Sequence, residues 1–129
     1  MSIRARATVC KGNDMTALPE QHVDIAALQD LKEIMESEFE TLINTFIMDS
    51  LNKLKELDEA IGTSDPEALR KVAHSLKGSS SNICAGELSE LARQLEFLGR
   101  EGSTDGATAL LENLREEFEV VKEVLQNNL

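Results

Sequence analysis

Aromatic residues, cysteine and proline are all scarce in this chain of 129 residues, which has four Phe, two Cys, two Pro and neither Trp nor Tyr. A core without large aromatic side chains must be built from Leu, Ile, Val, Ala and Met. Leu, Ala, Glu and Lys have good helix propensity, so the composition favours a helical protein. The length fits one domain, and a four-helix bundle of this size buries an adequate core.

The chain also lacks the motifs of several site classes. Cys10 and Cys84 form no CxxC pair and no Cys/His cluster, which argues against a disulfide framework and against a zinc site. The Gly-rich phosphate-binding patterns GxGxxG and GxxxxGK are absent as well. We therefore expect no cofactor, no metal and no kinase activity of its own.

Long apolar runs are missing too. The N-terminus has no apolar signal-peptide core, and no run is long enough to cross a membrane. The formal net charge of -11 argues against nucleic acid as a partner, because phosphate backbones are bound by surplus Lys and Arg. These patterns predict a cytoplasmic protein that binds neither membranes nor nucleic acid.

Hydrophobic periodicity divides the chain into a tail and one domain. Residues 1–20 show no periodicity, and we assign 1–22 to a flexible N-terminal tail and 23–129 to a helical bundle. Asp65-Pro66 is a strong helix start, and Gly62, Gly86, Gly99 and Gly102 are expected to mark helix ends. The expected helices are about 24–35, 37–61, 66–83, 87–100 and 105–126. The fold class is all-α, an antiparallel up-down-up-down four-helix bundle with a short extra N-terminal helix.

One histidine faces away from the expected core. The apolar stripe of the third expected helix, 66–83, consists of Leu69, Val72, Ala73, Leu76, Ser80 and Ile83. At 3.6 residues per turn these side chains lie within about 40° of a common direction, and His74 points roughly 140° away from it. His74 therefore lies on the outer surface of its helix.

The neighbours of His74 distinguish it from an ordinary surface histidine. Arg70 and Lys77 lie about one turn away on the same side. Gly78, also one turn away, costs about 1 kcal/mol relative to Ala inside a helix, which indicates that something approaches closely there. Residues 68–86 contain no acidic side chain, although the chain has 24. This strip suits an anionic partner surface or a phosphoryl group.

The motif around this histidine resembles the histidine-containing phosphotransfer (HPt) family. The resemblance covers about residues 24–129 and rests on Ala73-His74-Ser75-Leu76-Lys77-Gly78-Ser79-Ser80, followed by Ala85 and by Leu95-Glu96. It implies that Nε2 of His74 accepts a phosphoryl group from a receiver-domain aspartate and passes it to another receiver.

The same resemblance implies roles for other residues. Lys77 neutralises phosphoryl charge, Glu96 hydrogen-bonds Nδ1 of His74, and Gly78 leaves room for a docking receiver. Arg70, Lys71 and Ser81 are further candidates for partner docking. Many family members have glycine where Cys84 stands, which questions the local loop geometry. The implied partners are receiver domains of response regulators and of hybrid sensor kinases, met by a monomer in transient complexes.

Two other functions were weighed. A helical adaptor would bind a signalling partner without phosphoryl transfer. A metal-carboxylate enzyme needs Glu-x-x-His pairs facing inward, and neither His22 nor His74 has Glu three residues before it. Glu96 has an alternative role in an ion network with Arg93 and Arg100. His22 is interpreted as structural or incidental.

Overall fold

The structure, a computed structural model, describes residues 22–129, and this part of the chain contains helices and no strands. The helices are α3 (Ile25–Met35), the 3-10 turn η1 (Glu36–Glu38), α4 (Phe39–Gly62), α5 (Pro66–Asn82), α6 (Gly86–Arg100) and α7 (Ala107–Asn127). The predicted fold class is confirmed, with helix ends displaced by one or two residues at most. Of the predicted tail only His22 lies within the described residues, so the domain boundary stays a prediction.

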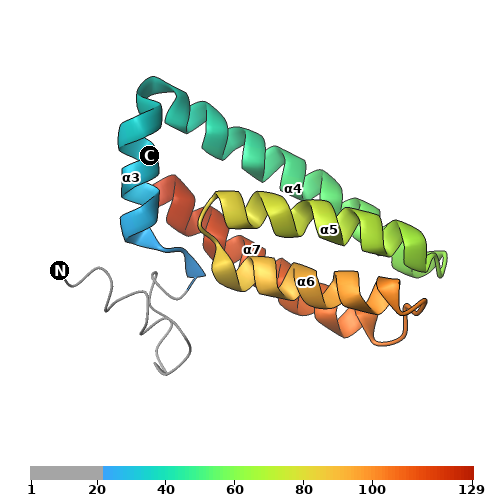
Figure 1. Cartoon of the computed structure of the whole chain (residues 1–129). Helices are drawn as coiled ribbons and strands as arrows, with labels where there is room; N and C mark the ends of the chain where they lie inside the picture. Colours follow the sequence, from blue (N-terminus) through green and yellow to red (C-terminus); the bar gives the residue numbers. More distant parts are fainter. Residues whose placement is uncertain (1–21) are drawn as a thin grey trace.

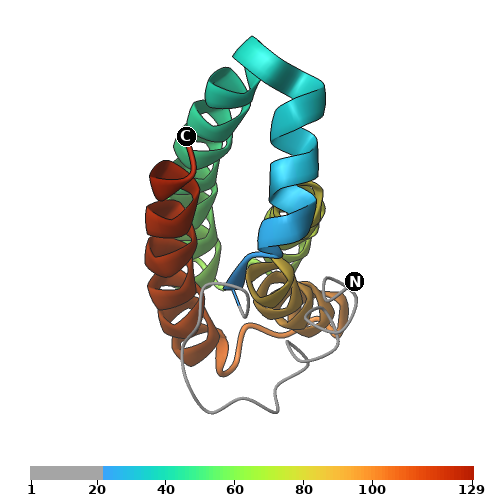
Figure 2. The same ribbon diagram turned by 90° about the vertical axis from the view of Figure 1, so that its left-hand side faces the viewer.

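Four of the helices form a closed bundle. Contacts join α4 to α5, α5 to α6, α6 to α7 and α7 back to α4, so each long helix packs against two neighbours. Figure 1 shows these helices running lengthwise, with α3 standing across one end of the bundle. The turned view in Figure 2 shows α3 and the last turns of α7 on opposite sides of this end. The short N-terminal helix therefore covers one end of the bundle.

The core is built from the apolar stripes of all the helices. Its fully or almost fully buried side chains are Leu28, Phe39, Ile43, Phe46, Ile47, Leu54, Leu57, Leu69, Ala73, Leu76, Ile83, Leu88, Leu95, Leu111, Leu114, Phe118, Val121 and Leu125. Other apolar residues lie at the edges of the stripes and are only partly buried: Ile25, Leu31, Ile61, Val72, Leu91, Leu98 and Leu110. The difference arises because the edge of a helical stripe meets solvent between two neighbouring helices.

Hydrogen bonds hold α3 to the bundle end. The Asp24 carboxylate caps α3 by accepting from Ala27 N–H at 3.1 Å. The backbone N–H of Asp24 donates to the carbonyl of Cys84 at 2.9 Å, which joins α3 to the α5–α6 turn. Nζ of Lys32 donates to the carbonyl of Asn128 at 2.9 Å, which joins α3 to the end of α7. These bonds hold α3 against the α5–α6 turn and against the end of α7.

Two of the glycine assignments were wrong. Gly86 does not separate helices but is the first residue of α6, whose N-cap is Ala85. Gly99 is the penultimate residue of α6 and not its end, and it is buried against α5. Gly62 is the last residue of α4, as expected, but the left-handed residue beyond it is Ser64, with φ of 52°. Gly102, with φ of 80°, takes the left-handed position after α6 as predicted.

The α5–α6 turn explains the departure at Cys84. Cys84 has φ of 68°, and its N–H donates to the Ser81 carbonyl at 3.0 Å. The N–H of Ala85 donates to the Ser80 carbonyl at 2.9 Å, which completes a Schellman motif with Cys84 at the left-handed position. Glycine is the usual residue there because it has no Cβ to clash. Cys84 keeps the same turn at a cost of about 1 kcal/mol.

Candidate functional site

The predicted site residues of α5 share one outer face. The side chain of His74 is 62% exposed. Gly78, Lys71 and Ser81 are exposed as well, whereas Arg70 and Lys77 are half-buried. Since positions three, four and seven apart lie on one side of a helix, this face meets solvent along most of α5. The inward stripe of the same helix holds it against the core, which leaves the His74 imidazole free to meet a partner.

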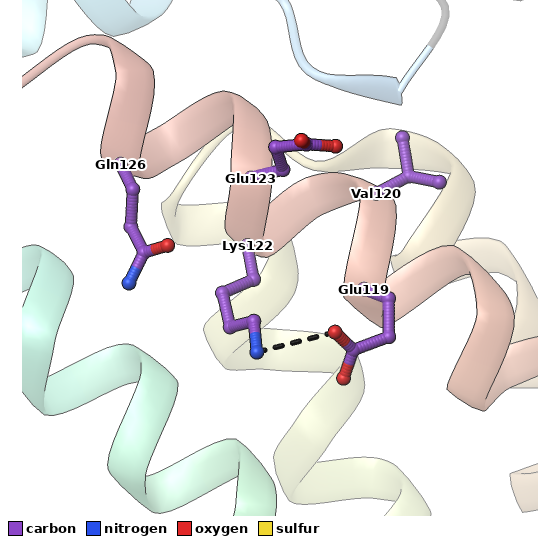
Figure 3. A pocket seen from close by; sticks show the side chains of 5 residues that line it. All are labelled: Glu119, Val120, Lys122, Glu123 and Gln126. Atoms are coloured by element: carbon purple, nitrogen blue, oxygen red, sulfur yellow. Dashed lines mark ion pairs between the residues drawn. The ribbon is translucent and has the colours of Figure 1, made fainter.

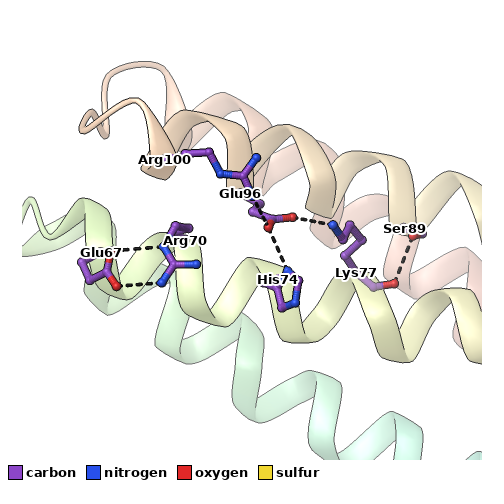
Figure 4. Close-up of polar contacts among 7 residues, drawn as sticks. All are labelled: Glu67, Arg70, His74, Lys77, Ser89, Glu96 and Arg100. Carbon is purple, nitrogen blue, oxygen red and sulfur yellow. Dashed lines mark hydrogen bonds and ion pairs between the residues drawn. The ribbon is translucent and has the colours of Figure 1, made fainter.

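Glu96 approaches this face from α6 and is almost completely buried, with 3% of its side chain exposed. Its Oε2 accepts a hydrogen bond from Nδ1 of His74 at 2.8 Å. Nζ of Lys77 contacts Oε1 at 2.8 Å, and Nη2 of Arg100 contacts Oε2 at 2.8 Å. Figure 4 shows the carboxylate lying between the two helices, with the imidazole and both cations converging on it. One carboxylate thus links residues from both helices.

The hydrogen bond determines which imidazole nitrogen is free. An ionised carboxylate only accepts hydrogen bonds, so Nδ1 of His74 must carry the proton. In the neutral imidazole the lone pair then lies on Nε2, at the solvent-facing end of the ring. The site therefore presents a nucleophilic nitrogen in a fixed orientation.

The charges at this site keep Glu96 ionised. The hydrogen bond from the Lys77 ammonium, followed by that from His74, lowers the pKa of the Glu96 carboxyl below its ordinary value despite burial. Lys77 and Arg100 bring two cations to one carboxylate, so this group carries a local positive excess in a protein of net charge -11. Such an excess favours an added anion, and a phosphoryl group is a strong acceptor of charge-assisted hydrogen bonds.

The two sequence-based roles of Glu96 are not exclusive in the structure. Glu96 contacts both His74 and Arg100, through the same oxygen. Arg93 does not join this network; its guanidinium pairs with Glu90 at 2.6 Å. That part of the alternative ion network was wrong, because Arg93 and Glu90 lie three residues apart on the exposed side of α6.

The candidate docking residues differ in the contacts they make within the chain. Arg70 forms a two-pronged ion pair with Glu67 on its own helix, with Nη2–Oε2 at 2.7 Å, so its charge is largely neutralised. Gly78 is different: a Cβ built there meets no atom within 4 Å. No contact with residues 22–129 requires glycine at this position.

Sequence reasoning missed two residues that shape the site. The Ser89 hydroxyl on α6 donates to the Lys77 carbonyl on α5 at 3.0 Å, which adds a second polar link between the helices. Gly99 allows α6 to approach the backbone of α5, where a Cβ would lie 2.6 Å from the Pro66 carbonyl oxygen. Neither has a local signature, since both depend on how α5 and α6 are placed against each other.

Other parts of the described chain offer less. A shallow concavity on α7 is lined by Glu119, Val120, Lys122, Glu123 and Gln126, with Lys122 paired to Glu119 (Figure 3). All of these residues come from one helix, so no groups converge from different elements. Across residues 22–129 no group of three or more His, Cys, Asp or Glu side chains is arranged to hold a metal ion. None of the helices described is long and apolar enough to span a membrane.

His22 contacts a buried carboxylate far from His74 in the sequence. Its Nδ1 lies 2.8 Å from Oε2 of Glu117 on α7, and both side chains are largely buried. Burial raises the pKa of the Glu117 carboxyl, and the contact with His22 only partly offsets this rise. This pair attaches the start of the described chain to the bundle, which fits the structural interpretation of His22.

Comparison with known proteins decides the family. The family model of the Hpt domain matches residues 41–124. This chain belongs to the Hpt domain family. It is also similar to the crystal structure of histidine-containing phosphotransfer protein B (HptB) from Pseudomonas aeruginosa PAO1, at 38% identity and a TM-score of 0.80. That match covers 83% of this chain and 93% of the other. A comparison with curated proteins finds no match.

The matched segment of this Hpt domain contains the whole His74 cluster, from α5 through α6. It also covers the four helices of the bundle, apart from the first residues of α4 and the last residues of α7. The protein is a phosphocarrier of phosphorelays, and it interacts with receiver domains.

Proposed function

We propose that His74 is the residue that carries the phosphoryl group, taking it from an aspartate of one receiver domain and giving it to an aspartate of another. The observation that supports this assignment is the exposed imidazole whose Nδ1 is bound by a buried carboxylate. In this arrangement the ring cannot turn freely, and Nε2 faces the solvent from which a receiver approaches. His22, the other histidine, lies largely buried against Glu117.

The transfer balances without an external base. The lone pair on Nε2 attacks the phosphorus of an aspartyl phosphate, the Nε2–P bond forms, and the P–O bond to the aspartate breaks. The aspartate leaves as a carboxylate with the bonding electron pair. The ring keeps the proton on Nδ1 and becomes cationic, facing the ionised Glu96 carboxylate. In the second transfer an aspartate carboxylate attacks phosphorus, and Nε2 regains its lone pair.

Lys77 is the cation best placed to meet the phosphoryl group. It lies one turn from His74, and its ammonium already contacts the carboxylate that holds the imidazole. A phosphoryl group adds up to two negative charges, which a nearby ammonium stabilises through charge-assisted hydrogen bonds. Glu96 acts through Nδ1, because its own charge repels the phosphoryl group.

The receiver docks over the exposed face of α5 in this proposal. Gly78 has open space where a side chain would be, although glycine weakens a helix by about 1 kcal/mol relative to Ala. Nothing in the described part of the chain compensates for that cost, so we assign it to the close approach of a partner. Lys71 and Ser81 extend the exposed face, and the contribution of Arg70 is reduced by its pairing with Glu67.

The phosphocarrier acts as a monomer in the cytoplasm without kinase activity, and it meets receivers of response regulators and of hybrid sensor kinases in transient complexes. The receiver supplies the metal ion and the acidic pocket of the transfer reaction. The chain itself contributes the nucleophile, its orientation and one neighbouring cation.

A labelling experiment tests the assignment. The chain is incubated with a receiver domain carrying a ³²P-labelled aspartyl phosphate, and we expect an acid-labile, base-stable label on the chain. His74→Gln should accept no label and should melt close to the parent, because the side chain faces solvent. His22→Gln is the matched control and should be labelled normally. Normal labelling of His74→Gln contradicts the assignment, and stable binding without any label favours a helical adaptor.

A further inference from the structure

Gly99 brings α6 close to the backbone of α5. A Cβ at this position would lie 2.6 Å from the carbonyl oxygen of Pro66 and 2.7 Å from the backbone nitrogen of Arg70. These are the two atoms that an α-helix joins by its i to i−4 hydrogen bond. Because both belong to the backbone, neither can rotate away as a side chain would. Any side chain at this position therefore separates the two helices.

This contact lies one turn from the His74–Glu96 hydrogen bond along both helices. Glu96 precedes Gly99 by three residues and is buried on the same side of α6. Arg70 precedes His74 by four residues on α5. A Cβ 2.6 Å from a backbone oxygen is closer than real Cβ atoms come, and restoring an ordinary contact of 3.4 Å would move α6 away from α5 by about 0.8 Å. A separation of this size stretches the 2.8 Å hydrogen bond between Nδ1 and Oε2, which weakens as its length grows past about 3.2 Å.

The other contacts of Glu96 tolerate such a shift better. Lys77 reaches the carboxylate through a long flexible side chain, and Arg100 lies on α6 and moves with Glu96. The His74 imidazole has only one methylene between its ring and the backbone, and its ring position follows the backbone of α5. Separating the helices would thus break the hydrogen bond to His74 before it broke the ion pairs.

We propose that Gly99 is a positioning residue for phosphoryl transfer, which holds α6 close enough to α5 for Glu96 to bind Nδ1 of His74. The inference rests on the proposed role of His74 as phosphoryl carrier. Gly99 touches no reacting atom; it acts through the distance between two helices. The absence of a side chain at Gly99 therefore allows two helices of the site to approach each other, whereas at Gly78 it leaves room for a docking partner.

The test compares Gly99→Ala with Gly86→Ala. Both substitutions replace glycine by the better helix former within α6, but a Cβ on Gly86 meets nothing within 4 Å. The ¹⁵N resonances of the neutral His74 imidazole report which nitrogen carries the proton, and they do so without any phosphoryl transfer. Rates are measured with phosphoramidate and with a phosphorylated receiver domain.

We expect Gly99→Ala to show a mixture of imidazole tautomers and a rate of His74 phosphorylation lower by about tenfold, the scale of one charge-assisted hydrogen bond. Gly86→Ala should keep the parental tautomer and rate. A parental tautomer in Gly99→Ala overturns the inference, while failure of the parent chain to accept phosphoryl groups would instead contradict the proposed function.

A stabilised background guards against loss of the fold. Gly62→Ala and Gly86→Ala both fill open positions on helices, and combining them should strengthen the bundle. Gly99→Ala is then introduced into that background and examined by the same resonances. If the bundle still does not form, Gly99 is required for folding as a whole, and the positioning role is overturned.

Discussion

Nδ1 of His74 and Oε2 of Glu96 lie 2.8 Å apart, and this contact joins the most exposed side chain of the cluster to the most buried one. The exposed partner can meet another protein, and the buried partner is held still by its surroundings. Water competes poorly for a carboxylate that is 3% exposed, so the orientation of the imidazole persists between transfers. The geometry combines access for the nucleophile with a fixed tautomer.

Substitutions of Glu96 should separate its hydrogen bond from its charge. Glu96→Gln keeps an acceptor for Nδ1–H and should slow phosphoryl transfer only mildly. Glu96→Ala removes the acceptor and should slow transfer by about tenfold, the scale of a hydrogen bond to a charged group. Transfer rates and the imidazole ¹⁵N resonances are measured together. If Glu96→Ala changes neither, the ion pair with Arg100 is the better account of this residue.

Lys77→Ala should slow transfer and shorten the lifetime of the phosphohistidine. The substitution removes the cation nearest to the phosphoryl group and leaves the Glu96 carboxylate less well balanced. Decay of the labelled chain at neutral pH gives the lifetime. Lys122→Ala, on α7, causes the same change in net charge away from His74 and serves as the control. Equal lifetimes in the two variants would assign the effect to overall charge.

Gly78→Gln should stabilise the bundle and weaken receiver binding. The space at Gly78 is open, and a residue with better helix propensity gains up to about 1 kcal/mol there. A docking receiver would meet the new side chain, and its affinity should fall by about tenfold or more. Urea unfolding gives the stability, and calorimetry gives the affinity. Gly62→Gln fills another open position as a control; unchanged affinity for Gly78→Gln would exclude a docking role.

The stability of Glu117→Gln relative to the parent chain should increase as the pH rises. Burial raises the pKa of the Glu117 carboxyl in the folded chain, so the folded state holds this proton more tightly than the unfolded state does. The stability contributed by Glu117 therefore falls as the pH rises from its ordinary range through the raised pKa. Gln carries no such proton, so its free energy of unfolding relative to the parent should improve between about pH 4 and pH 7.

Denaturation in urea at both pH values measures this change. Glu116→Gln, at the exposed neighbouring position, should show no such improvement. The stability contributed by Glu96 should depend on pH in the opposite direction, because hydrogen bonding from Lys77 lowers the pKa of Glu96. The stability that Glu96 contributes is present above its ordinary pKa and is lost as the pH falls through the lowered one. A Glu117→Gln effect that fell with rising pH would contradict the assigned direction.

Local sequence patterns determined the helices and their faces. The 3.6-residue period placed Leu69, Ala73 and Leu76 inward and His74 outward, because side chains on one helix cannot change face without a change in the whole helix. Asp65-Pro66 predicted the start of α5, and the Asp65 side chain accepts from Ala68 N–H at 3.1 Å. These features depend on residues that are close together in the chain, so they can be predicted from the sequence.

Only the tertiary structure decided how the helices meet. The burial of Glu96, the approach of Gly99 to the α5 backbone and the pairing of His22 with Glu117 all join residues from different elements. They depend on the rotation of each helix about its axis and on its shift along its neighbour. Packing of the whole core sets these quantities, with many side chains contributing at once. For this reason the sequence identified His74 as exposed, while the distances that orient its imidazole arose from the packing of α5 against α6.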